Sequence, residues 1–170
     1  VRAVESRRRL LEVLADFWRN HLNVSDSKAP YWPNQYEENV LREHAFGRWE
    51  DLLMASAKHP AMLVYLDNHL SRKGEINENY AREVMELHTL GVDNHYTQRD
   101  VIALTRALTG WTCFWRNDSA GKEEWRFVFR ENHRDTDPKE ILGLRLDGAG
   151  KAAGFQPGAD ALRRDAQRIA

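Results

Sequence analysis

Apolar positions recur at intervals of three and four residues over most of the chain, which is the spacing of one face of an α-helix. The clearest case covers residues 10–22, where the apolar positions are Leu10, Leu11, Leu14, Phe17, Trp18 and Leu22. The polar positions between them are Arg8, Arg9, Glu12, Asp16 and Arg19. At 3.6 residues per turn these two sets fall on different faces, so the pattern predicts an amphipathic helix with a wide apolar stripe.

Five further helices follow from the same spacing and from local start and stop signals. Their expected ranges are 34–45, 49–57, 60–66, 77–90 and 97–108. Pro60 suits the first position of its helix, where a backbone N–H has no helical partner. Thr97 and Asp100 have the spacing of a capping box, and Gly91 and Gly110 can end the helices that precede them.

Strand signals are sparse. Residues 125–129 alternate large apolar with other side chains, which is typical of a short strand. The predicted fold is therefore all-α, or mainly α: a multi-helix array with one short strand or hairpin near residues 125–146. We expect residues 1–146 to form this helical domain. Residues 147–170 are rich in Gly and Ala and predict a loose segment with a terminal helix at its end.

Composition narrows the class of protein. Hydrophobic residues make up 42% and charged residues 30% of the chain, and the formal net charge is −1. This balance is ordinary for a globular domain and gives no overall attraction to nucleic acid, so we expect no nucleic-acid partner. The longest apolar run covers residues 61–66, far short of the ~20 that a membrane-spanning helix needs. Because the chain starts at Val1 in what looks like the middle of a helix, we expect it to be a fragment of a larger protein.

Six segments, in order along the chain, resemble those of the bacterial family called domain of unknown function 1800 (DUF1800). They read FWRNH (17–21), REHAFG (42–47), KHPAMLVYLD (58–67), NENYAREVMELHTLG (77–91), YTQRDV (96–101) and ALTGW (107–111). The resemblance covers residues 7–146 and fades after Gly148. It implies an exported protein, periplasmic or secreted, several hundred residues long and encoded beside a sulfatase-like partner. It implies no particular activity.

The strongest candidate chemistry lies on the predicted helix 77–90. At about 100° per residue, Asn79, Glu83 and Glu86 share one face and Arg82 lies at its edge. Two carboxylates one turn apart suit acid–base work, because burial of such a pair raises one pKa. His88 diverges from Glu86 by about 160° on a regular helix, so a shared site would need partners from other helices. We predict Glu83, Glu86, His88 and Arg82 as catalytic residues, with Asn79 binding substrate.

Two other residue types extend the candidate site. His21 and His44 lie within the family-like segments, and imidazoles from several helices can bind a divalent metal, although no HxH or HxxxH spacing supports this. His44 also fits a hydrogen-bonded position in the core. Trp32 and Trp111 are candidates for stacking on sugar rings, although Trp111 fits the core better, and Trp32 and Trp115, which lie in loops, are better placed for ligand contact.

Two functional hypotheses follow. The first is a hydrolase or lyase, metal-assisted in one version, that acts on an extracellular polymer such as a polysaccharide. The alternative is a non-catalytic binding or assembly module, in which Glu83 and Glu86 form ion pairs with Arg82, Arg42 or Arg106 and fix the packing of helices.

Overall fold

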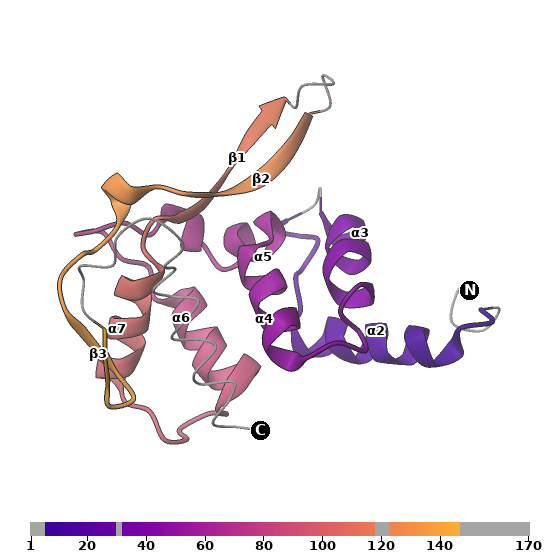
Figure 1. Cartoon of the computed structure of the whole chain (residues 1–170), viewed down its shortest axis with the longest axis horizontal. Helices are drawn as coiled ribbons and strands as arrows, with labels where there is room; N and C mark the ends of the chain where they lie inside the picture. Colours follow the sequence, from indigo (N-terminus) through magenta and orange to yellow (C-terminus); the bar gives the residue numbers. More distant parts are fainter. Residues whose placement is uncertain (1–5, 30–31, 118–122, 147–170) are drawn as a thin grey trace.

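Helices dominate the computed structural model, which describes residues 6–29, 32–117 and 123–146 (Figure 1). The helical elements are α2 (Arg9–His21), α3 (Pro33–Tyr36), η1 (Glu37–Arg42), α4 (Trp49–Lys58), α5 (Pro60–Tyr65), η2 (Asn68–Leu70), α6 (Asn79–Glu83), η3 (Val84–Thr89), α7 (Gln98–Leu108) and η4 (Glu131–His133). The strands are β1 (Trp111–Asn117), β2 (Glu123–Phe129), β3 (Lys139–Ile141) and β4 (Leu144–Leu146). The fold is thus mainly helical, but two antiparallel strand pairs mean that it is not strictly all-α. The segment 147–170 lies outside the described residues.

The two hairpins follow the helices in the chain. Strand β1 pairs with β2 from Trp111 opposite Phe129 to Asn117 opposite Glu123, and this hairpin projects beyond the helices (Figure 1). The sequence pattern predicted its second strand but not its first. The shorter β3–β4 pair packs against α7. None of the helices in the described residues is long and apolar enough to cross a lipid bilayer.

Two helix starts predicted from the sequence, at Pro60 and at Thr97, are confirmed. Pro60 occupies the start of α5, and the Nδ1 atom of His59 accepts a hydrogen bond from the backbone N–H of Ala61 at 3.2 Å. At the start of α7, the Thr97 backbone N–H donates to the Asp100 carboxylate at 2.8 Å, as a capping box requires.

The hydrophobic core is one cluster that joins α3, η1, α4, α5, α6, η3 and α7 to the first residues of β1 and to the β3–β4 hairpin. Its largest fully enclosed side chains are Leu22, Leu41, Leu52, Leu53, Met62, Leu63, Tyr80, Met85, Leu104, Leu108, Trp111 and Ile141. Complete burial of a side chain of this size contributes about 1.5–3 kcal/mol, so this cluster fixes the relative positions of the helices.

Two of the predicted α-helices contain π-helical turns. The segments 34–45 and 77–90 were expected to be regular, but η1 and η3 have i→i+5 hydrogen bonding. In η3 the Leu90 N–H donates to the Met85 carbonyl at 2.9 Å, and the Thr89 hydroxyl donates to the Val84 carbonyl at 2.6 Å. A π turn holds one more residue than an α turn, so it changes which side chains share a face.

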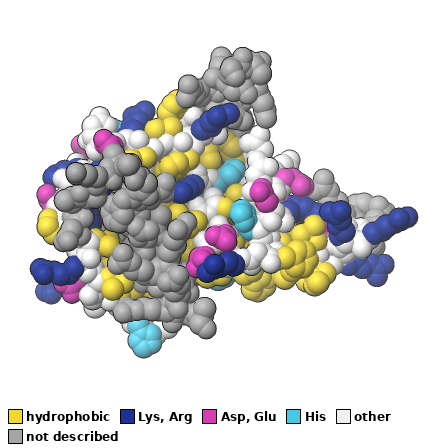
Figure 2. Space-filling model, viewed as in Figure 1, with side chains coloured by type: hydrophobic (Ala, Val, Ile, Leu, Met, Phe, Trp, Pro, Cys, Tyr) yellow, Lys and Arg dark blue, Asp and Glu magenta, His cyan; other side chains and the backbone are white. Residues whose placement is uncertain are grey.

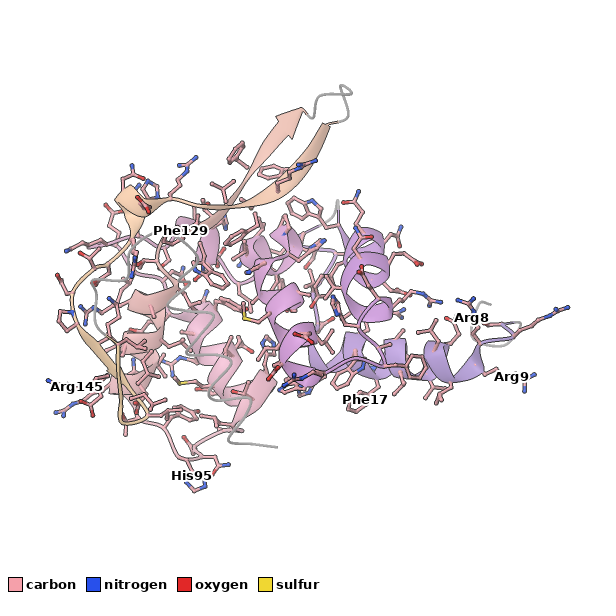
Figure 3. All side chains as sticks on the ribbon, viewed as in Figure 1. Arg8, Arg9, Phe17, His95, Phe129 and Arg145 are labelled. Atoms are coloured by element: carbon pink, nitrogen blue, oxygen red, sulfur yellow. The ribbon has the colours of Figure 1, made fainter. Side chains whose placement is uncertain are left out.

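The side chains that helix α2 buries differ from those predicted from the sequence. Leu10, Val13 and Phe17 are exposed, and hydrophobic side chains gather over this helix in Figure 2; Phe17 is labelled in Figure 3. The buried acidic residue is Glu12, which was assigned to the solvated face. Its two carboxylate oxygens accept hydrogen bonds from Arg42 at 2.8 Å each, so an ion pair joins α2 to η1.

Gly110 is expected to tolerate no side chain. Its φ is +85°, and an added Cβ would lie 2.7 Å from the carbonyl oxygen of Arg130. At Gly143 φ is +76°, but a Cβ would meet nothing within 4 Å. Gly143→Ala should therefore lose only the ~1–2 kcal/mol of a left-handed backbone, whereas Gly110→Ala should lose a further ~1–3 kcal/mol. Free energies of unfolding from urea titrations test this difference, and equal losses would contradict it.

Candidate active site

A pocket of about 530 Å³ lies between the end of α2, the end of α5 and the helix α6–η3. Its lining residues are Asn20, His21, Asn23, Tyr65, Leu66, Glu83, Leu87 and His88. The volume falls within the range of about 300–1,000 Å³ that is typical of small-molecule sites. Carboxylate, imidazole, amide and phenol groups from three separate elements therefore share one concave space.

The π turn explains why Glu83 and His88 share this pocket. On a regular α-helix, residues five apart point about 140° away from each other. In η3 the i→i+5 bonding brings residues five apart onto one face. A regular helix would place Glu83 and Glu86 on one face. In the structure, Glu83 instead shares the pocket with His88.

Glu83 has the properties of a proton donor. It is half-buried, and no described residue forms a hydrogen bond or ion pair with its carboxylate. Burial raises the pKa of Glu83, the nearby Glu86 carboxylate raises it further, and Arg82 partly opposes the shift. A raised carboxyl pKa increases the protonated fraction near neutral pH, as a general acid requires.

His21 enters the pocket from α2 with a fixed tautomer. Its Nε2 lies 3.1 Å from the backbone carbonyl oxygen of His88. Because a carbonyl oxygen only accepts, His21 Nε2 carries the proton, and in the neutral ring Nδ1 keeps its lone pair. Phe17 stacks on the ring, with the centroids 6.2 Å apart, and Trp49 packs beside it at 5.3 Å. The ring is thus held in place, and in its neutral form Nδ1 is the nitrogen that can accept a proton.

His88 forms the inner wall of the pocket. Its side chain is buried, and burial lowers its pKa to about 4, with a further contribution from His21, whose ring centroid lies 6.5 Å away. Its Nδ1 atom is enclosed and has no hydrogen-bond partner among the described residues. His88 is therefore neutral at neutral pH and provides a polar, uncharged wall.

Arg82 and Glu86, two predicted catalytic residues, do not line the pocket. Arg82 donates to Glu86 at 3.2 Å, to Glu78 at 3.0 Å and to the Gln98 side-chain oxygen at 2.8 Å. This network joins α6 to α7, so for these two residues the structure favours the ion-pair interpretation. Asn79 also lies away from the pocket, and its amide donates to the Asp67 carboxylate at 3.2 Å.

The remaining predicted residues are dispersed. Trp32 packs edge-on against Trp125, and Trp111 packs against Phe127 with 1% of its surface exposed, so neither ring offers a face to the pocket. His44 does not line the pocket with His21. Among the described residues, no three His, Cys, Asp or Glu side chains are grouped as a metal site would require.

Five lining residues were missed by the prediction: the polar Asn20, Asn23 and Tyr65, and the apolar Leu66 and Leu87. Asn20 and Tyr65 lie within the family-like segments 17–21 and 58–67, and Glu83, Leu87 and His88 lie within the segment 77–91. Every lining residue except Asn23 comes from one of these three segments. These three segments meet in the folded protein, and the linear sequence does not show that they do.

Residues 1–167 match the family model described as "Protein of unknown function (DUF1800)". The chain is a DUF1800 protein. The match runs well past residue 146, where the resemblance was expected to fade. No curated protein and no solved structure matches this DUF1800 chain.

Substitution of Glu86 by glutamine should lower the pKa of Glu83 while leaving the fold intact, because the negative charge of Glu86 helps to raise that pKa. The ion pair that Glu86 loses joins partly exposed side chains, which contributes at most ~1 kcal/mol. Titration of the Glu83 carboxyl carbon by NMR measures the shift directly. Glu140→Gln, an exposed change on β3, is the matched control, and an unchanged Glu83 pKa in Glu86→Gln would refute the coupling.

Proposed function

We propose that this DUF1800 chain is a hydrolase that cleaves glycosidic bonds in a neutral, hydroxyl-rich polysaccharide. The observation that carries the proposal is the presence of Glu83 and His21 in one pocket. The first is a carboxyl group with a raised pKa, and the second is an imidazole whose tautomer leaves a lone pair on Nδ1. Groups with opposite roles in proton transfer, supplied by separate elements, are what acid–base catalysis requires.

In the proposed step, the protonated Glu83 carboxyl donates its proton to the glycosidic oxygen as the C–O bond breaks. Nδ1 of His21 removes a proton from a water molecule, whose oxygen forms the new bond to the anomeric carbon. The products are one new reducing end and one new hydroxyl group. Glu83 is left as a carboxylate and His21 as an imidazolium, and proton exchange with solvent restores both.

The charge of the lining favours hydrolysis of a neutral chain over elimination from an acidic one. Among the described residues that line the pocket there is no lysine or arginine, and the one carboxylate belongs to Glu83. A lyase that acts on uronates must offset the substrate carboxylate, usually with a cation or strong donors. The amides of Asn20 and Asn23 and the phenol of Tyr65 instead suit hydroxyl groups, which both donate and accept hydrogen bonds.

The family resemblance supports two further parts of the proposal. A polysaccharide substrate lies outside the cell, which fits a periplasmic or secreted protein. A sulfatase-like partner removes sulfate esters and leaves a chain with less negative charge, which is the kind of chain that this lining favours.

The test is to incubate the chain with neutral and uronate polysaccharides and to measure two products. Hydrolysis gives new reducing ends without carbon–carbon double bonds, whereas elimination gives an unsaturated sugar that absorbs ultraviolet light. We expect new reducing ends from at least one neutral polymer and no unsaturated product. Unsaturated product from uronates, or no cleavage of any neutral polymer, would overturn the proposal.

A further inference from the structure

A second pocket of about 270 Å³ adjoins the candidate active site, and Asn23 lines both. The second pocket lies between the loop after α2 and the helices α3 and η1. Because Asn23 is common to the two, the pockets lie on either side of this one residue. The smaller volume is below the range of drug-sized sites, which suits one unit of a chain rather than a whole ligand.

The second pocket offers unused hydrogen-bonding groups. No described residue forms a hydrogen bond with the side-chain amide of Asn23 or Asn34. Each amide has two donors and one acceptor oxygen, which match the mixed donor and acceptor character of sugar hydroxyls. Val24 and Leu41 line the same pocket but belong to the buried core, so the groups that this pocket offers a ligand are mainly polar.

The charges in this pocket disfavour an anionic ligand. The Arg19 guanidinium is engaged by the Glu37 carboxylate at 2.5 Å, so its positive charge is already offset. The carboxylate of Asp26 also lines the pocket, and no described residue pairs with it. The local charge is thus negative, and a carboxylate or sulfate group there would be repelled.

We infer that the second pocket is a subsite that binds the next unit of a neutral, hydroxyl-bearing chain, with Asn34 as a binding residue and Asn23 as the junction. The position of the cleaved bond in the first pocket rests on the proposed function. The existence of the subsite does not, because it concerns binding alone. The cleft as a whole then selects chains over single sugars.

The experiment uses the full chain carrying Glu83→Gln, so that ligands stay intact during titration. Calorimetry with β-1,4-linked glucose and N-acetylglucosamine oligomers of two and four units measures how the binding affinity depends on the length of the ligand. We expect the four-unit ligand of at least one series to bind more tightly than the two-unit ligand. Asn34→Ala, added to this background, should weaken the four-unit ligand by about three- to tenfold, the effect of one hydrogen bond. The two-unit ligand should be unaffected.

Asn39→Ala is the matched control, because Asn39 is exposed on η1 and lines neither pocket. NMR signals of the Asn34 side-chain amide give a second measurement that needs no substitution there, and they should shift with the four-unit ligand only. The inference is overturned by equal affinities for both lengths, by an Asn34→Ala effect that is absent or equal at both lengths, or by no binding of either series. Length-dependent binding without cleavage by the unsubstituted chain would overturn the proposed hydrolysis and leave the subsite standing.

Discussion

Replacement of Glu83 by glutamine is expected to lower kcat on a neutral polysaccharide by about 10²–10⁴-fold, the typical contribution of a general acid. Glutamine has nearly the same shape, but its amide cannot protonate a leaving oxygen. Stability should change little, because no described residue forms an ion pair or hydrogen bond with the Glu83 carboxylate. The burial that raises its pKa also means that an uncharged side chain is well tolerated at this position.

The measurements are initial rates of reducing-end release and the melting temperature of each variant. Glu140→Gln makes the same chemical change on the exposed side of β3, away from the pocket, and should retain full activity. The rate with unsubstituted Glu83 should also fall as the pH rises through the raised pKa of this carboxyl group. Retention of kcat in Glu83→Gln would exclude Glu83 as the acid.

Acidification should destabilise the fold through two histidines, of which His88 is buried and His59 is partly buried. Burial lowers the pKa of both His59 and His88 to about 4, from an ordinary value of 6.5. The unfolded chain therefore binds protons more readily than the folded chain between these values. The stability that each neutral ring contributes is fully present above pH 6.5, falls as the pH drops through this window, and is lost below pH 4. Each histidine accounts for about 3 kcal/mol.

Free energies of unfolding in urea at pH 7, 5.5 and 4 test this expectation. Glu83 acts in the opposite direction, because its raised pKa favours protonation in the folded state, and it reduces the net loss. His88→Gln should remove about half of the loss over this pH range, whereas His95→Gln, at an exposed turn, should remove none. A stability that is flat from pH 7 to pH 4 would contradict the neutral state of both rings.

The parts of the fold that were predictable are those encoded by a few neighbouring residues. The start of α5 at Pro60 and the capping box at Thr97 depend on chemistry within one helical turn, and both are confirmed. The strand β1 was missed because its opening residues, from Trp111 to Phe114, carry no alternation of apolar and polar side chains. Its identity depends on pairing with β2, which is a long-range contact.

The segment that contributes most to the site could be predicted from the sequence, but the arrangement of its side chains could not. The importance of the run 77–91 was evident, and Glu83 and His88 were chosen within it. Glu86 was paired with Glu83 because a regular helix was assumed, and a π turn leaves no distinct mark in the apolar pattern. The contributions of Asn20 and Tyr65 required the packing of α2 and α5 around that segment, which no local signal specifies.

The π turn in η3 also bears on how this protein can be engineered. A regular α-helix is the lower-energy backbone, so deletion of one residue between Val84 and Gly91 can be accommodated by an ordinary turn. A deletion after His88 would leave Glu83 and His88 five residues apart on a regular helix and point them about 140° away from each other, whereas a deletion between them would leave them four apart and on one face. A selection for heat resistance alone would therefore favour a regular helix here, and a thermostable design that keeps the proposed site has to hold Glu83 and His88 on one face.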